Sequence, residues 1–284
     1  MTAHSSPVSN AEIRPFLLDV PQSELDDLDA RLAAARWPAE ASDQGWSHGA
    51  PVAYLKDLVD YWRRGYDWRA QEARFNAHPQ FSTEIDGENV YFLHVRSPEP
   101  GALPLIVSHG WPSSPAEFLD VIAPLTDPRS HGGDPSQAFH LVIPSPPGYG
   151  LSGPTRRLGW GSSRVARAWA ELMRRLGYDR YGACGSEWGT WISRELGAVA
   201  PDSVLGVHGC GFVSWPSGRE DELDGLDDVE RERLAFAEHY MNRLYGYKLI
   251  QSSRPQAIAC GLTDSPAGLA AWTASVYKDW TDCV

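Results

Sequence analysis

The spacing of apolar residues changes along the chain and separates helical parts from strand-forming parts. In two early segments, residues 25–35 and 52–62, apolar side chains recur every three or four positions between polar ones. That period places them on one face of a helix. Both helices precede every predicted strand, so we expect an N-terminal helical extension that packs on a core formed later in the chain.

Strand patterns begin near residue 81 and fill the middle of the chain. The first two, at 81–85 and 90–95, surround an Asp-Gly-Glu-Asn turn that is typical of a hairpin. The later strands are short, and the first of them is a continuous apolar run, as expected for a strand buried on both faces. They are predicted at residues 103–107, 141–143, 181–185 and 204–208. An antiparallel start followed by strand–helix alternation predicts an α/β sheet, and helical patterns return after residue 215.

The junction at residues 185–189, which reads Gly-Ser-Glu-Trp-Gly, joins a predicted strand to a helix. This spacing is that of a nucleophile elbow, in which the middle residue takes a strained turn and the glycines leave room for it. The register selects Glu187, because neither Ser186 nor Cys184 has glycines at both flanking positions. A carboxylate here favours displacement at an sp³ carbon, with an ester intermediate, over acyl transfer. The alternative is a strand–glycine–helix turn with a capping Glu.

Composition limits the classes of protein and partner. The chain has 284 residues, 42% of them apolar, and a formal net charge of −12 at pH 7. These values are typical of a globular protein, and the negative charge argues against nucleic acid or an anionic membrane as partners. Because no apolar run has the length of a signal peptide or membrane span, we expect no membrane anchor. Four cysteines without metal or disulfide spacing favour reduced thiols and a cytoplasmic location.

Several further strings accompany the elbow. They are His-Gly-Trp-Pro at 109–112, a Gly/Pro-rich string at 147–154, and two helical strings at 250–256 and 262–272. Together with the segment 13–38, they make the sequence resemble epoxide hydrolases of the microsomal type. The resemblance runs over the whole chain, and the two helical strings are its most specific part because nothing in the fold demands them.

The resemblance implies a fold and a division of the chain. The family has an α/β-hydrolase core sheet with an N-terminal helical extension and a helical lid. Carried over to this sequence, the domains are residues 1–80 (N-terminal helical domain), 81–215 (core) and 216–284 (partial lid). The sequence ends within the lid, so we expect the family's C-terminal core strands to be missing.

The resemblance also implies roles for four residues. Glu187 stands at the position of the nucleophile, and the backbone N–H groups of Trp111 and Trp188 stand where the family forms its oxyanion hole. Tyr247 stands at the position of a lid tyrosine that hydrogen-bonds the epoxide oxygen. The implied reaction opens a small apolar epoxide to a diol through a carboxylate ester, without a metal or organic cofactor.

Two features depart from the family. Its nucleophile is Asp, and the additional methylene of Glu187 displaces the carboxylate, where a misplacement of about 1 Å costs roughly 10²-fold in rate. The family's second tyrosine and general-base histidine lie in strands that this sequence does not contain. Among the nine histidines only His208 could approach the site, and a packed strand histidine is the commoner case. We therefore expect no general base, and an oxyanion hole that is unused while carbon is attacked.

Three hypotheses about function stay open at this point. The first is an epoxide hydrolase truncated in its lid, and the second is a haloalkane dehalogenase, which also has an elbow carboxylate followed by Trp. The third is a catalytically inactive homologue, either a binding protein or a gene remnant. Diol formation from styrene oxide and halide release from a haloalkane separate them. In each case an open edge at strand 204–208 predicts self-association.

Overall fold

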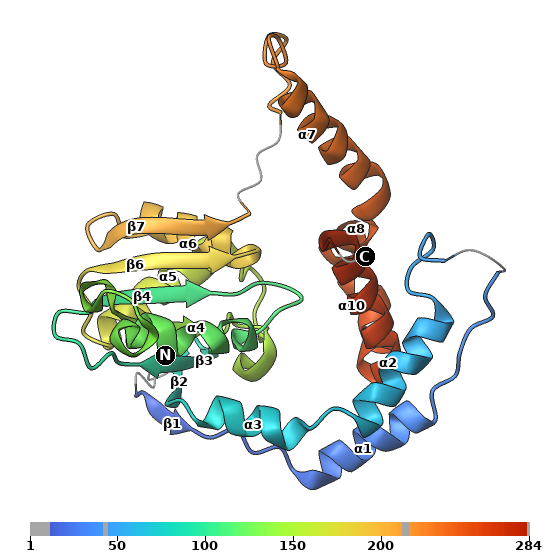
Figure 1. The fold of residues 1–284 in the computed structure, drawn as a ribbon, viewed down its shortest axis with the longest axis horizontal. Coiled ribbons are helices and arrows are strands. Elements are labelled where there is room, and N and C mark those ends of the chain that lie inside the picture. The colour runs from blue at the N-terminus through green and yellow to red at the C-terminus, as the bar shows by residue number, and fades with distance from the viewer. Residues whose placement is uncertain (1–11, 42–44, 212–215, 283–284) are drawn as a thin grey trace, which may run out of the picture. The chain divides into compact units, whose positions relative to one another are not determined.

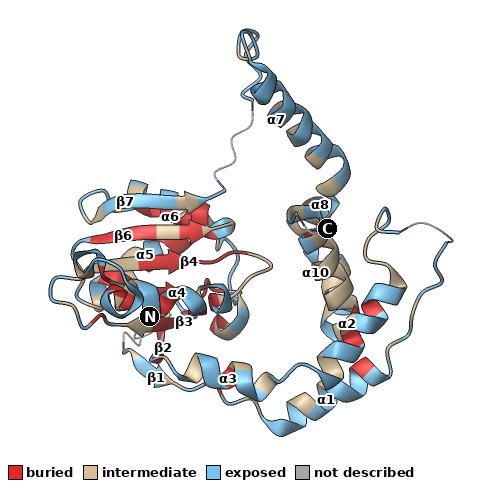
Figure 2. Ribbon diagram, viewed as in Figure 1, coloured by how far each residue is buried: buried red, intermediate tan, exposed pale blue. Residues whose placement is uncertain are grey.

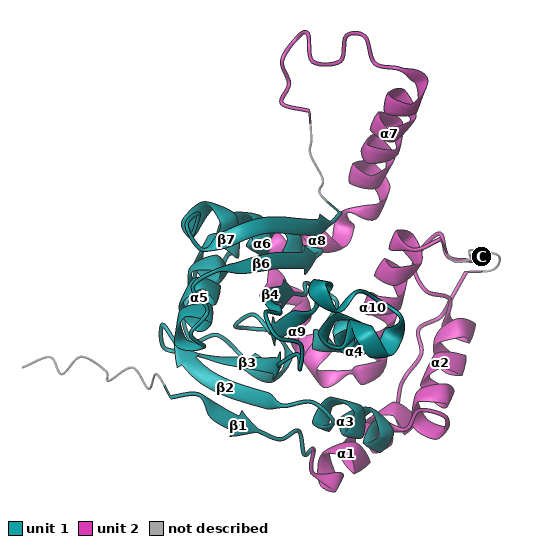
Figure 3. Cartoon of the chain, turned by 60° about the vertical axis from the view of Figure 1, so that its left-hand side comes forward, with its two compact units in different colours: residues 1–19, 68–214 teal, residues 20–67, 215–284 magenta. Residues whose placement is uncertain are grey.

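The computed structural model describes residues 12–41, 45–211 and 216–282. The chain divides into two compact units, and each combines segments that are distant in the sequence (Figure 3). Unit 1 consists of Met1–Asp19 and Trp68–Ser214, and unit 2 consists of Val20–Asp67 and Trp215–Val284. The three domains predicted from the sequence (1–80, 81–215 and 216–284) are successive segments of the chain, and this division stays a prediction.

Unit 1 contains a mixed seven-stranded sheet with the strand order β1-β2-β3-β5-β4-β6-β7 (Figure 1). The pairs β1–β2, β2–β3 and β3–β5 are antiparallel, whereas β4 is parallel to β5 and β6, and β6 is parallel to β7. The strands are β1 (Arg14–Phe16), β2 (Gln80–Ile85), β3 (Glu88–Val95), β4 (Leu103–Ser108), β5 (Phe139–Pro144), β6 (Tyr181–Ser186) and β7 (Val204–Cys210). The prediction of antiparallel strands followed by parallel strands is confirmed. Strand β1 is not predicted from the sequence.

Helices cover both faces of this sheet. They are α3 (Trp68–Asn76), α4 (Leu119–Thr126), α5 (Ser162–Arg175) and α6 (Trp188–Val199). Side chains alternate along the central strands, so that Ile106 packs with α5 and α6 whereas its neighbour Val107 packs with α4. Burial on both faces explains why β4 and β5 read as short apolar runs, and Figure 2 shows buried residues along β4 and β6.

Strand β7 lies at the edge of the sheet. Among the residues that the structure describes, β6 is the only strand that pairs with it. Its apolar side chains are partly open to solvent: Leu205 is 46% exposed and Val207 is 39% exposed. The strand carries no Lys, Glu or Pro, the residues that commonly protect an edge from pairing with another chain.

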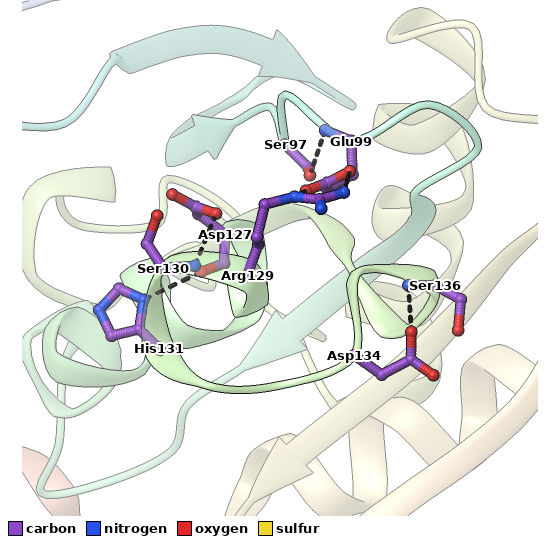
Figure 4. Close-up of polar contacts among 8 residues, drawn as sticks. All are labelled: Ser97, Glu99, Asp127, Arg129, Ser130, His131, Asp134 and Ser136. Carbon is purple, nitrogen blue, oxygen red and sulfur yellow. Dashed lines mark hydrogen bonds and ion pairs between the residues drawn. The ribbon is translucent and has the colours of Figure 1, made fainter.

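Polar contacts fix the loops that lead into β4 and β5 (Figure 4). Arg129 pairs with Glu99 through two hydrogen bonds of 2.8 and 3.1 Å, and this contact lowers the pKa of Glu99. Asp127 and Asp134 each accept a backbone N–H at the start of a short 3₁₀ turn. These loops precede their strands, whereas Glu187 follows the carboxyl end of β6. The contacts therefore stabilise the end of the sheet away from the elbow.

Unit 2 is helical. It contains α1 (Gln22–Ala33), α2 (Val52–Arg64), α7 (Asp228–His239), a π-helical turn (Tyr240–Leu244), α8 (Gly246–Ser253), α9 (Pro255–Asp264) and α10 (Pro266–Trp280). Its small core is formed by Leu32, Val59 and Ala267, one from each of α1, α2 and α10. The apolar faces of the two N-terminal helices thus meet a helix from the end of the chain. We expected them to pack on the core that begins at residue 81.

Candidate active site

The elbow lies between β6 and α6, and Glu187 is its central residue. Glu187 adopts φ 50° and ψ −122°, a left-handed conformation that a residue with a Cβ rarely takes. A conformation of this kind costs on the order of 1–3 kcal/mol and persists only where the surroundings enforce it. The strained turn between strand and helix is present where the sequence predicts it.

The glycines of the elbow are required by close backbone contacts. A Cβ on Gly189 would lie 1.8 Å from the carbonyl oxygen of Ser108, at the end of β4. A Cβ on Gly185 would lie 2.1 Å from the carbonyl carbon of Gly189. The first turn of α6 is therefore pressed against the ends of two adjacent strands. This contact brings the elbow next to the turn that follows β4.

Two backbone N–H groups hold the carboxylate of Glu187. The N–H of Trp111 donates to Oε2 over 3.0 Å, and the N–H of Trp188 donates to the same oxygen. Gly110 makes room for this arrangement, since a Cβ there would lie 2.1 Å from Oε2. The pair that we expected to be unused before ester hydrolysis thus binds the carboxylate already. The longer Glu side chain folds back far enough to place one oxygen between these donors.

Glu117 links the two halves of the site. It lies in the 3₁₀ turn Pro115–Phe118 and accepts hydrogen bonds from the hydroxyls of Ser113 and Ser186. Ser113 belongs to the turn that carries Trp111, and Ser186 directly precedes Glu187. The exposed Glu117 carboxylate therefore ties the oxyanion turn to the elbow. No sequence pattern indicates this role of Glu117, because only the folded chain brings residues 113 and 186 together.

Tyr149 is a second residue that the sequence analysis left without a role. Its ring contacts the His109 imidazole edge-on, with 5.9 Å between centroids. Burial raises the pKa of Tyr149 to about 12, and the charge of Glu187 contributes in the same direction. The phenol is thus within electrostatic reach of the carboxylate. Its position in the string 147–154 is the one signal that could have drawn attention to it.

Tyr247 lies in α8 and belongs to unit 2. Its hydroxyl is 2.9 Å from the hydroxyl of Tyr240, and its ring packs on Trp280 with 5.4 Å between centroids. Tyr240 lies in the π-helical turn, a distortion frequently found at functional sites. Because Tyr247 and Glu187 belong to different units, their joint action on an epoxide stays a prediction.

Three histidines of unit 1 have partners of their own. His208 is exposed on β7, with Nδ1 3.4 Å from Cys184 Sγ, so it is not the packed strand histidine that we expected. The exposure follows from the edge position of β7. His94 contacts the Tyr178 hydroxyl over 2.9 Å, and His140 accepts the N–H of Ser97 over 3.0 Å.

Metal-binding clusters and membrane-spanning helices are both absent from the part of the chain that the structure describes. In the described ranges, no group of three or more His, Cys, Asp or Glu side chains has the arrangement of a metal site. No helix within those ranges combines the length and apolarity needed to cross a bilayer. Cys184, Cys210 and Cys260 are free thiols, and Cys283 lies outside the described residues.

Two family models match the sequence. Residues 13–118 match the model described as "Epoxide hydrolase N terminus", and residues 104–266 match the model described as "alpha/beta hydrolase fold". A putative epoxide hydrolase of Stigmatella aurantiaca is 43% identical over 95% of this chain and 61% of its own length. Epoxide hydrolase 1 of Sus scrofa is 34% identical over 95% of this chain and 63% of its own. The chain spans about three fifths of the length of these curated relatives.

Solved structures give the same match in three dimensions. The Aspergillus niger epoxide hydrolase is 31% identical with a TM-score of 0.82, over 95% of this chain and 70% of that chain. The juvenile hormone epoxide hydrolase of Bombyx mori is 28% identical with a TM-score of 0.85, over 96% of this chain and 68% of that chain. The likeness therefore covers nearly all of the present sequence, including both compact units.

Proposed function

The chain belongs to the epoxide hydrolase family with the α/β-hydrolase fold, and from this premise we propose that Glu187 opens an epoxide by attacking one of its carbons. The support is the position of Oε2 between the N–H groups of Trp111 and Trp188. With that oxygen held, Oε1 is the atom that attacks. The strained turn fixes the carboxylate on a rigid strand–helix junction, which reduces the entropy lost on reaching the transition state.

The proposed reaction has two steps. In the first, the Oε1–carbon bond forms as the epoxide C–O bond breaks, and the departing oxygen takes a proton from the phenol of Tyr247. In the second, water adds to the ester carbonyl and gives up a proton that restores the Tyr247 phenol, while the two N–H groups stabilise the negative charge that develops on the carbonyl oxygen. Collapse of this adduct releases the diol and restores the carboxylate. Neither step uses a metal or organic cofactor.

We propose that ester hydrolysis is the slow step in the present chain. Activation of the water needs a general base, whose contribution is typically about 10²–10⁴-fold. In unit 1, His94 and His140 are engaged with Tyr178 and Ser97, and His208 lies against Cys184. The chain is therefore expected to accumulate an ester on Glu187 rather than to turn over. Aromatic residues at the site, Trp111 and Trp188, favour a small apolar epoxide as substrate.

Incubation with styrene oxide, followed by intact-mass measurement and peptide mapping, tests the proposal. One equivalent of adduct on the peptide that contains Glu187 supports it, and the Glu187→Gln variant is expected to lack that adduct. Mapping is needed because epoxides also alkylate thiols, and Cys184 lies near the elbow in sequence. Steady diol release beyond one equivalent would contradict slow hydrolysis, whereas an adduct confined to cysteines would contradict the role of Glu187.

A further inference from the structure

The imidazole of His109 and the carboxylate of Glu187 contact opposite ends of one peptide unit. His109 Nδ1 lies 3.0 Å from the carbonyl oxygen of Gly110, and the N–H of the same peptide, on Trp111, donates to Glu187 Oε2 over 3.0 Å. We infer that His109 is a positioning residue that orients this peptide so that its N–H points at the nucleophile. The inference assigns the imidazole itself a role, beyond the turn that its backbone forms.

The hydrogen-bond pattern determines where the protons of His109 lie. The carbonyl oxygen of Gly110 can only accept, so Nδ1 must carry a hydrogen. His109 is 0% exposed, and burial lowers its pKa, so the ring is neutral near pH 7. Nε2 therefore accepts from the Ser145 hydroxyl at 2.9 Å, and this is the shorter contact of that hydroxyl, which also lies 3.2 Å from the carbonyl oxygen of Tyr149. One tautomer satisfies both nitrogens.

Ser145 gives the ring a rigid anchor on the neighbouring strand. It directly follows β5 and is itself 0% exposed. Its backbone N–H donates to the carbonyl of Tyr91 over 2.9 Å, and its own carbonyl accepts the Ser152 hydroxyl over 2.6 Å. The imidazole thus connects the Ser145 hydroxyl, at the end of β5, with the Gly110 carbonyl. Rotation of the Gly110–Trp111 peptide would break the hydrogen bond between His109 Nδ1 and the Gly110 carbonyl.

A second donor acts on the same carbonyl. The N–H of Ser113 donates to the Gly110 oxygen over 3.1 Å, which together with His109 occupies both lone pairs. Hydrogen bonds in series polarise one another, so donors on the carbonyl strengthen the N–H of the same peptide as a donor. His109 therefore affects both the direction and the strength of the Trp111 hydrogen bond to Glu187.

Isotope labelling isolates this peptide. The sequence contains three Gly–Trp pairs, at residues 45–46, 110–111 and 159–160, so ¹³C-carbonyl glycine with ¹⁵N tryptophan gives three cross-peaks in a carbonyl–amide correlation spectrum. The Trp111→Phe variant identifies the relevant one by its loss. In His109→Leu, which removes the donor, the Gly110 carbonyl and Trp111 amide proton are expected to shift upfield while the other two pairs stay in place. His109→Asn, whose amide nitrogen can replace Nδ1, is expected to shift less.

Equal shifts in the Leu and Asn variants, or no shift in the Leu variant, would overturn the inference. If His109→Leu does not fold, Ser145→Ala decides: loss of the hydroxyl at Nε2 is expected to move the same cross-peak, and an unmoved peak overturns the role of His109. These spectra do not depend on activity.

A kinetic measurement then links the peptide to the chemistry and rests on the proposed function. The rate at which the ester on Glu187 is hydrolysed is expected to fall about 10–100-fold in His109→Leu, because the Trp111 N–H stabilises the oxyanion of that step and complete loss of one oxyanion donor costs about 10²–10³-fold. His109→Asn is expected to recover part of that rate. An unchanged rate in His109→Leu contradicts the role in catalysis. A wild-type chain that forms no ester contradicts the proposed function, while the spectra still decide the positioning role.

Discussion

The indole N–H of Trp169 donates to the hydroxyl of Ser108 over 2.9 Å, and both side chains are almost completely buried. Ser108 ends β4 one residue before His109, and Trp169 lies in α5. The hydrogen bond thus fixes the strand end that carries the oxyanion turn to the helix layer beneath it. Ser108 also supplies the carbonyl against which Gly189 packs.

Ser108→Ala should destabilise unit 1 by about 1–3 kcal/mol, because it leaves the buried indole N–H of Trp169 without an acceptor. Ser193→Ala is a matched control: Ser193 is 1% exposed, and among the described residues its hydroxyl has no partner. Removing that hydroxyl from α6 should be neutral or stabilising. Urea unfolding followed by tryptophan fluorescence compares the two. Equal losses of unfolding free energy in both variants would show that the Trp169 hydrogen bond does not contribute measurably to stability.

Gly189→Ala should prevent the native elbow from forming. The added Cβ would meet the Ser108 carbonyl at 1.8 Å, and both partners are backbone, so relief requires α6 to move away from β4. The expected result is loss of the cooperative melt of unit 1, measured by circular dichroism. Gly206→Ala in β7 is the control, since a Cβ at that position would have no atom within 4 Å and its φ is not positive. A Gly189→Ala protein that melts like wild type would contradict the close contact.

Acid should destabilise unit 1 between about pH 6.5 and pH 4. Burial, assisted by the charges of Arg96 and His140, lowers the pKa of His94 to about 4, and burial also lowers the pKa of His140. In this range the unfolded chain binds protons that the folded chain does not, so stability is full above pH 6.5 and falls toward pH 4. Protonation of His140 at Nδ1 would also remove the acceptor of the Ser97 N–H.

The measurement for this prediction is the urea midpoint as a function of pH. Each proton taken up on unfolding corresponds to about 1.4 kcal/mol per pH unit. His94→Gln, which can keep a hydrogen bond to the Tyr178 hydroxyl, should flatten the profile between pH 6.5 and 4. A profile with the wild-type slope would exclude His94 as a source of the pH dependence.

The edge strand should cause self-association, and a charge placed on it should suppress this. Leu205→Lys puts an ammonium on β7 where another chain would pair, which opposes edge-to-edge contact. Leu158→Lys is the control, because Leu158 is 97% exposed but lies outside every strand. Sedimentation velocity over a range of concentrations should show association for wild type and Leu158→Lys, and less for Leu205→Lys. A monomeric wild-type chain contradicts the prediction.

Sequence patterns predict the sheet well because its central strands are buried on both faces, so the apolar runs appear directly in the chain. Helix α3 is not predicted from the sequence, because its buried side is not marked by apolar residues. Its buried position is occupied by Glu72, which is paired with Arg69 over 2.7 Å and accepts the Trp68 indole N–H over 3.2 Å, so the helix has no apolar stripe. A buried carboxylate leaves no periodic signal in hydrophobicity.

At the elbow, too, features that depend on local sequence are predictable, and features that depend on tertiary packing are not. Its glycines and Glu187 are predictable because local backbone geometry demands them within five residues. The contacts of Glu117 with Ser113 and Ser186, and of His109 with Ser145, join segments whose proximity depends on strand order. Strand order is set by packing over the whole sheet, so these partners emerge only in the folded chain.

The core of unit 2, formed by Leu32, Val59 and Ala267, has a consequence for biosynthesis. Ribosomes add about 5–20 residues per second, so α10 is completed roughly 10–40 s after α2. During that interval the apolar faces of α1 and α2 lack the contact with α10, while the seven strands of the unit 1 sheet emerge and can fold. The core of unit 2 therefore cannot be completed until translation has passed α10, and until then the apolar side chains of its first two helices stay open to solvent or to other contacts.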